Sequence, residues 1–113
     1  MLRDEIRKEI LTSLKSIKPY KVILFGSFAY GNPDDNSDID LFVVTDDDYL
    51  PKNYKENMKN YLMVSSKLRD LKKNIPIDLV VHTKPMYDNF IRMGSLFSRE
   101  VMKRGEVLYE KDS

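Results

Sequence analysis

The chain of 113 residues contains no cysteine, and it has only one histidine. Without cysteine it cannot have a disulfide framework, a thiolate metal site or a thiol nucleophile. It also lacks any run of about 18 apolar residues, so no membrane-spanning helix is predicted. The charged N-terminal segment "MLRDEIRKEI" does not contain the apolar core of a signal peptide. We therefore expect a cytoplasmic protein without a membrane partner.

An excess of charge is absent as well, because 19 Lys and Arg residues face 18 Asp and Glu residues, for a net charge of +1. Such a balance gives no general attraction to nucleic acid, and we expect no direct nucleic-acid binding. With 42% apolar and 33% charged residues, the composition is that of a soluble globular protein. The length suits one modest core, so residues 1–113 are predicted to form a single domain.

Hydrophobic patterns predict an α/β fold. Apolar residues recur every three or four positions in two segments, which predicts helices at residues 2–18 and 53–73. Residues 83–93 and 95–104 are predicted to form two further helical segments. Three short apolar runs predict strands at residues 20–25, 38–45 and 75–82. Residues 106–110 are predicted to be a short terminal strand or an extended tail. The expected architecture is a small mixed β-sheet with helices on one side.

Two carboxylates open the predicted strand 38–45. Side chains alternate between the faces of a strand, so Asp38 and Asp40 lie on the same face, about 7 Å apart along the backbone. Two carboxylates this close repel each other unless a positive charge lies between them. Mg²⁺ is commonly held by one or two carboxylates together with substrate phosphates. The pair therefore indicates a site for a divalent cation.

The predicted strand 75–82 contains a third carboxylate, Asp78, in the middle of an apolar run. Burying a carboxylate without a partner is unfavourable, which suggests that Asp78 has a specific neighbour. If the two strands lie side by side, Asp78 joins Asp38 and Asp40. Three carboxylates can bracket two metal ions about 3.5–4 Å apart, as in enzymes of phosphoryl transfer.

The segment before the acid pair has the features of a phosphate-binding turn. Gly26 and Ser27 follow a predicted strand and open a short helix that Gly31 closes. Exposed backbone N–H groups at a helix start bind phosphate, glycine allows close approach, and a serine hydroxyl can donate a hydrogen bond. The turn and the acid pair would then hold the two halves of one nucleotide site.

Simpler interpretations exist for each feature by itself. An Asp-x-Asp pair can mark a strand that starts in a solvated loop, and a mid-strand Asp is often an edge or ion-paired residue. Gly-Ser after a strand is usually only a turn. His82, as a lone histidine, is more often structural than catalytic, and the Lys- and Arg-rich segments fit solvated helix faces. The three features together, in this order, favour a site.

Other nucleotide and metal motifs do not match. Gly26 and Gly31 have the glycine spacing of a P-loop, but Asn32 and Pro33 occupy the positions of its Lys and Ser/Thr. The dinucleotide-binding pattern fails because Phe28 replaces its second glycine. An EF-hand loop from Asp34 fails because Ile39 occupies the glycine position.

The segments "GSFAYG", "SDIDLFVV" and "PIDLVV" resemble the minimal nucleotidyltransferase (MNT) family of the DNA polymerase β superfamily, of the HEPN/MNT antitoxin type. The family pattern is Gly-Ser, ten residues, then Asp-x-Asp, and residues 26–40 match it without a gap. The ending "SREVMKRGEVLYE" is also similar to that of the family. One departure is Tyr30, because many relatives have arginine at this position.

The resemblance implies a polymerase β-like palm fold and Mg²⁺-dependent transfer of a nucleoside monophosphate, AMP from ATP, to a hydroxyl group. Gly26 and Ser27 would hold the β- and γ-phosphates. Asp38 and Asp40 would bind two Mg²⁺ ions. Asp78 would bind the catalytic ion and orient or deprotonate the acceptor.

The resemblance also implies a partner. Many family members are antitoxins that bind a HEPN-type ribonuclease toxin, and some transfer AMP to a tyrosine of that toxin. Two alternatives stay open: a transferase for small molecules of the aminoglycoside-modifying kind, working as a homo-oligomer, and an antitoxin that acts by binding alone. The complete Gly-Ser and three-Asp set argues against the second alternative, whereas Tyr30 argues mildly for it.

Overall fold

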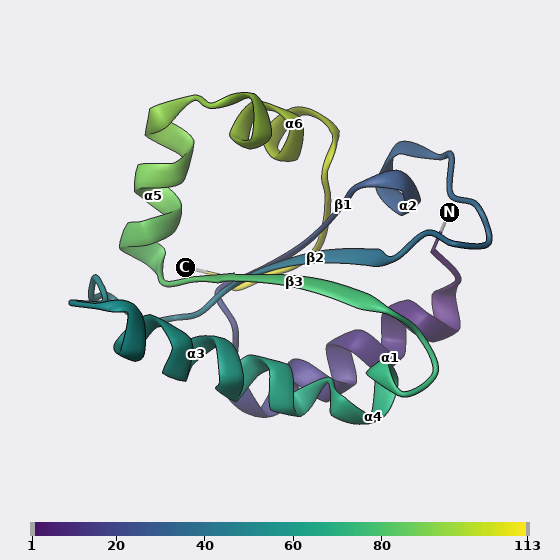
Figure 1. The fold of residues 1–113 in the computed structure, drawn as a ribbon, viewed down its shortest axis with the longest axis horizontal. Helices are drawn as coiled ribbons and strands as arrows, with labels where there is room; N and C mark the ends of the chain where they lie inside the picture. Colours follow the sequence, from purple (N-terminus) through teal and green to yellow (C-terminus); the bar gives the residue numbers. More distant parts are fainter. Residues whose placement is uncertain (1, 113) are drawn as a thin grey trace.

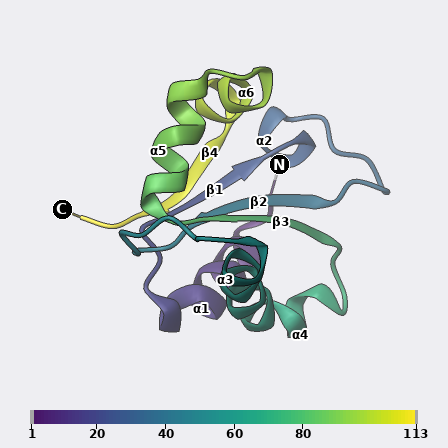
Figure 2. The same ribbon diagram turned by 60° about the vertical axis from the view of Figure 1, so that its left-hand side comes forward.

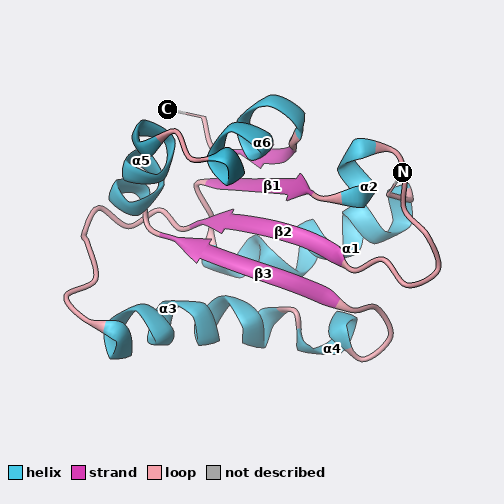
Figure 3. Ribbon diagram, turned by 45° about the horizontal axis from the view of Figure 1, so that its top comes forward, coloured by secondary structure: helices cyan, strands magenta, loops and turns pink. Residues whose placement is uncertain are grey.

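The structure, a computed structural model, describes residues 2–112 and has a four-stranded sheet with the strand order β3-β2-β1-β4 (Figure 3). The strands are β1 (Lys21–Phe25), β2 (Ile39–Val44), β3 (Ile77–His82) and β4 (Glu106–Glu110). β2 and β3 are parallel, whereas β1 is antiparallel to both β2 and β4. The prediction of a mixed sheet is confirmed, and the last segment is an edge strand rather than a loose tail.

Seven helical segments accompany the sheet in the described part of the chain. They are α1 (Asp4–Leu14), the 3₁₀ turn η1 (Lys15–Ile17), α2 (Ser27–Tyr30), α3 (Tyr54–Lys67), α4 (Arg69–Lys72), α5 (Lys84–Met93) and α6 (Leu96–Arg104). The predicted helix start at Asn53 is confirmed, since its side chain accepts a hydrogen bond of 2.9 Å from the Glu56 amide. The predicted helix 53–73 is divided at Leu68 into α3 and α4.

The helices cover both faces of the sheet, so the prediction of helices on one side is wrong. α1, α3 and α4 lie against one face, and α5 and α6 against the other (Figures 1 and 2). The physical reason lies in β2, whose side chains are buried on both faces. Leu41 and Val43 belong to the core under α1 and α3, whereas Phe42 and Val44 belong to the core under α5 and α6.

The two cores differ in size and character. The core on the α1/α3/α4 side has eleven buried residues, all aliphatic. The core on the α5/α6 side has five, and Phe42 is at its centre, with ring centroids 5.7 Å from Tyr87 and 5.1 Å from Phe90. Burying each such side chain contributes about 1.5–3 kcal/mol. The aromatic core therefore anchors α5 and α6 on the face of the sheet to which Phe42 and Val44 point.

No helix between residues 2 and 112 combines the length and the apolar character needed to cross a membrane.

Candidate active site

The residues singled out in the sequence meet at one edge of the sheet. β1 ends there, α2 follows it directly, and β2 and β3 both begin there (Figure 3). In the strand register, Phe25 at the end of β1 lies opposite Asp40, and Asp40 lies opposite Asp78. Asp40 therefore occupies the middle position, between the turn after β1 and the carboxylate on β3.

Asp40 and Asp78 form a close carboxylate pair. They share a register position in two parallel strands, so their side chains point to the same face, which is the α5/α6 face. Asp40 is half-buried and Asp78 is exposed. Burial, then the charge of Asp78, then the charge of Asp38 raise the pKa of Asp40 from 3.8 to about 6, and Asp78 is within hydrogen-bonding reach of the protonated form. A cation at this point would relieve that repulsion.

Gly26 brings the predicted phosphate turn into direct contact with Asp40. A Cβ atom at Gly26 would lie 2.0 Å from Oδ2 of Asp40, so any side chain there would have to displace the Asp40 carboxylate. The backbone there has φ 75° and ψ −163°, a conformation that is accessible essentially only to glycine. The turn and the carboxylate thus pack against each other, and a ligand held by one of them touches the other.

The turn also presents free backbone donors. The amides of Ala29 and Tyr30 bond to the Gly26 carbonyl at 3.0 Å, but within residues 2–112 the amides of Ser27 and Phe28 have no backbone acceptor. With only four residues, α2 has a small dipole, so these local N–H groups and the Ser27 hydroxyl are what the turn offers to an anion.

Asp38 lies just before β2 and acts on Asp40 through its charge. Within residues 2–112, no three His, Asp or Glu side chains form a group that could hold a metal ion by themselves. The arrangement nevertheless fits Mg²⁺, because this ion needs only one or two carboxylates when substrate phosphates complete its coordination. The adjacent oxygen donors of Asp40 and Asp78 meet that requirement.

Asp46 and Asp48, which follow β2, do not belong to this site. Asp46 and Asp48 lie 2.9 and 3.0 Å from the Lys84 ammonium group, and Asp46 also pairs with Lys111. Hydrogen bonds from Lys111 and Lys84 lower the pKa of Asp46. Asp46 and Asp48 are thus paired with lysines at the far end of β2, away from Asp40.

His82 is a packing residue, as the sequence suggested. Its ring lies 4.7 Å from the ring of Phe42 and 5.5 Å from that of Phe90, both edge to face. Burial lowers its pKa, so the imidazole is neutral inside the aromatic core at pH 7.

A group of three side chains that was not predicted from the sequence connects α2 with α6. The guanidinium carbon of Arg104 lies 4.1 Å from the Tyr30 ring centroid, and a guanidinium nitrogen lies 3.8 Å from the Glu100 carboxylate. The pKa of Tyr30 is raised, mainly by burial, with the Gly26 amide acting against the shift and Glu100 adding to it. No sequence signal pairs residues so far apart, although Tyr30 itself stood out as a departure from its relatives.

The sequence matches the family model described as "Polymerase beta, Nucleotidyltransferase" over residues 8–113. Two relatives come from Methanocaldococcus jannaschii, and both are named as candidate protein adenylyltransferases. The first, MJ0604, is 32% identical over 96% of this chain and 100% of its own length. The second, MJ0141, is 36% identical over 77% of this chain and 82% of its own length.

Solved structures share the fold. A toxin–antitoxin complex with AMP-PNP has a TM-score of 0.60 and 23% identity, covering 94% of this chain and 74% of the other. A nucleotidyltransferase-like protein of Sulfolobus solfataricus has a TM-score of 0.59 and 21% identity, covering 94% and 78%. A complex described as tri-AMPylated Shewanella oneidensis HEPN toxin with MNT antitoxin has a TM-score of 0.57 and 19% identity, covering 97% and 74%. At these identities the likeness concerns the fold alone.

Proposed function

The chain belongs to the polymerase beta nucleotidyltransferase family, and from this premise we propose that it transfers AMP from ATP to a protein hydroxyl group, with Mg²⁺ as its cofactor. One observation carries the proposal. Asp40 is packed between the Gly26 turn on one side and Asp78 on the other, so a phosphate grip and a carboxylate pair lie in contact. This juxtaposition suits the transfer of a phosphorus-centred group, in which positioning and charge neutralisation do most of the work.

Each predicted residue has a role in this proposal. The amides of the Gly26–Ser27 turn and the Ser27 hydroxyl hold the β- and γ-phosphates. Asp40 and Asp78, with Asp38 beside them, provide the oxygen ligands for two Mg²⁺ ions. Bound there, Mg²⁺ supplies neutralisation of the phosphate charge. Asp78 is the more exposed carboxylate of the pair. In this proposal it faces the acceptor and orients its hydroxyl group.

The reaction is a substitution at the α-phosphorus of ATP. The acceptor oxygen forms a bond to this phosphorus, and the bond from the phosphorus to the bridging oxygen of the β-phosphate breaks. Pyrophosphate leaves with that electron pair. The hydroxyl proton passes to Asp78 and from there to water. The product is a phosphodiester between AMP and the acceptor, with no change of oxidation state.

For the acceptor we propose a tyrosine of a HEPN-type toxin, which the transfer of AMP inactivates. Two findings support this choice. The relatives from M. jannaschii are named as candidate protein adenylyltransferases, and one structure of the same fold is described as an MNT antitoxin with an AMP-modified HEPN toxin. In this reading the protein is an antitoxin that acts by modification.

The test is incubation of the protein with α-³²P-labelled ATP and Mg²⁺, with and without the product of the neighbouring gene, which we expect to be a HEPN-type protein. We expect label on that partner, located on tyrosine by mass spectrometry, and none with the Asp40→Asn or Asp78→Asn variants. Label on an aminoglycoside-like small molecule would identify a small-molecule transferase instead. A stable complex without any label would identify a binding antitoxin, and both of these results contradict the proposal.

A further inference from the structure

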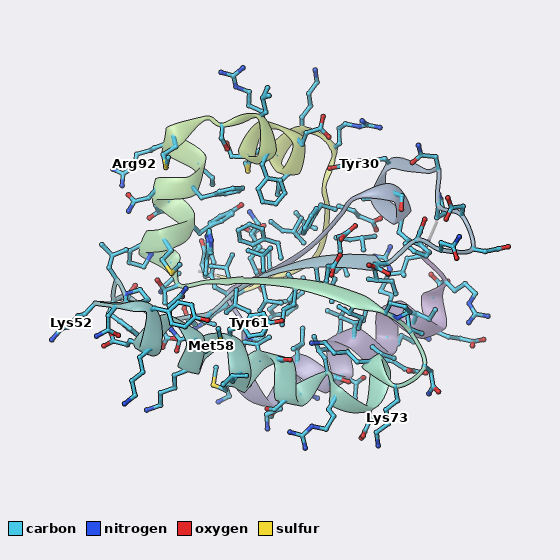
Figure 4. The ribbon with its side chains drawn as sticks, in the orientation of Figure 1. Tyr30, Lys52, Met58, Tyr61, Lys73 and Arg92 are labelled. Carbon is cyan, nitrogen blue, oxygen red and sulfur yellow. The ribbon has the colours of Figure 1, made fainter. Side chains whose placement is uncertain are left out.

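Arg104 is placed beside the phosphate turn by contacts that the proposed reaction has not used. It belongs to the last turn of α6, and its guanidinium group lies over the ring of Tyr30 at 4.1 Å from the centroid. Tyr30 ends α2, and its amide bonds to the Gly26 carbonyl at 3.0 Å. Figure 4 shows Tyr30 between α2 and the end of α6. The cationic group is therefore one aromatic ring away from the turn.

A positive side chain at the site would add to the charge neutralisation that Mg²⁺ supplies. ATP brings a triphosphate to a place that already holds the charges of Asp38, Asp40 and Asp78, and like charges at this distance repel each other. Among the cation–π contacts of residues 2–112, the one between Arg104 and Tyr30 places a cationic group against α2. Lys84, Lys111 and Lys21 are paired with acids at the other end of the strands.

The present partner of Arg104 holds it only weakly. Glu100 lies 3.8 Å away, one helical turn earlier, and both side chains are 49% exposed. An exposed pair with this spacing stabilises a helix only slightly, so a triphosphate can compete with Glu100 for the guanidinium group. The fork of an arginine also matches two phosphate oxygens at once, whereas the ring of Tyr30 limits the directions in which the side chain points.

We infer that Arg104 binds the triphosphate of the nucleotide substrate, and that Tyr30 is a positioning residue that holds Arg104 beside the Gly26–Ser27 turn. The inference rests on the proposed function, since it concerns the same nucleotide. The cationic side chain that binds the phosphates is then on α6 and not on α2.

Binding measurements separate this role from a structural one. Dissociation constants for ATP, inorganic tripolyphosphate and AMP are measured by calorimetry with Mg²⁺ present. We expect Arg104→Ala to weaken ATP and tripolyphosphate about tenfold, the effect of losing one hydrogen-bonded charge, and AMP much less. Arg104→Lys should recover part of the loss. Arg92→Ala is the matched control, because Arg92 bonds to Asn89 on α5, at the opposite side of this helical layer from Tyr30 (Figure 4).

A rescue variant tests the geometry. Arginine at position 30 places the cation on α2 directly, so Tyr30→Arg combined with Arg104→Ala should restore tripolyphosphate binding. Unchanged ATP and tripolyphosphate affinity in a folded Arg104→Ala protein would overturn the inference while leaving the proposed function intact. Equal losses for AMP and ATP would overturn it too, since a general structural defect would explain them. If the wild type binds neither ATP nor tripolyphosphate, the proposed function itself fails.

Discussion

At Gly26, both the fold and the proposed site depend on the absence of a Cβ atom. We expect Gly26→Ala to destabilise the fold by about 1–3 kcal/mol because of its backbone conformation alone. It should also abolish ATP binding, since the new Cβ displaces the Asp40 carboxylate, whose Oδ2 lies 2.0 Å from that position. Chemical denaturation and calorimetric titration with ATP measure the two effects.

Gly31 offers the control. It also has a positive φ, 87°, but a Cβ there meets no atom within 4 Å. Gly31→Ala should therefore show the backbone cost while retaining ATP binding. Equal losses of ATP affinity in both variants would contradict the contact between the turn and Asp40.

Asp40 should make stability depend on pH in an unusual direction. Its pKa is higher in the folded chain, about 6, than the ordinary value of 3.8, so the folded chain binds the additional proton between these values. Stability therefore falls as the pH rises from about 4 to about 6, and the full penalty persists above that window. Without metal, Asp40→Asn should melt at a higher temperature than the wild type at pH 7.5, and at a similar temperature at pH 3.5.

The same variant should be inactive in AMP transfer, because a neutral amide is a poor ligand for Mg²⁺. Differential scanning fluorimetry across pH, with EDTA present, provides the measurement. A lower melting temperature for Asp40→Asn at pH 7.5 would show that the carboxylate is stabilised by contacts and not strained by repulsion.

The spacing of the acidic residues has a simple geometric meaning, so part of their arrangement was predictable from the sequence. Alternation along one strand predicted that Asp38 and Asp40 share a face, and Asp78 was expected to join them if the two strands lie side by side. The strand register has Asp40 and Asp78 as neighbours. The contact of Gly26 with Asp40 and the approach of Arg104 to Tyr30 were beyond sequence reasoning. Both depend on tertiary packing between segments with no common periodicity.

Among the elements, β2 determines the architecture because both of its faces are buried. Phe42 is fully buried and contacts the rings of Tyr87, Phe90 and His82. We expect Phe42→Ala to cost about 3–5 kcal/mol of unfolding free energy, as for other large aromatic residues removed from a core. Urea denaturation measures this value, with Leu50→Ala as the control, because Leu50 is 53% exposed.

The same measurement shows whether Phe42 is the main contact that holds α5 and α6 on the sheet. A loss near 1 kcal/mol for Phe42→Ala would mean that α5 and α6 are held mainly by other contacts, such as the ring pair of Phe25 and Phe97 at 5.3 Å.

Element types were largely predictable, and layer assignment was not. The strands at residues 20–25, 38–45 and 75–82 and the helices near residues 53, 84 and 96 all occur. A continuous apolar run such as "LFVV" is compatible with burial on one or both faces. Only the packing of α5 and α6 against Phe42 and Val44 decides that helices cover both sides.

For the whole molecule, we propose that the chain unfolds as one cooperative domain. The radius of gyration is 13.7 Å, close to the roughly 13 Å expected of a compact domain of about 100 residues. Both cores include residues of the strands β1 and β2, so we expect global unfolding to disrupt them together. Melting followed by far-UV and near-UV circular dichroism should give coincident transitions, which ATP with Mg²⁺ shifts upward. Two separate transitions would argue for independent units.

The two helical layers pack on cores of unequal size, and this difference has a dynamic consequence. The core under α5 and α6 has five buried residues, whereas the core on the other face has eleven. We therefore expect the layer of α5 and α6 to open first in local fluctuations. Its amide protons should exchange with deuterium faster than those of α1 and α3. Since α6 carries Arg104, bound nucleotide should slow amide exchange in α5 and α6 more than in α1 and α3. Substrate binding would then stabilise the helical layer that has the smaller core.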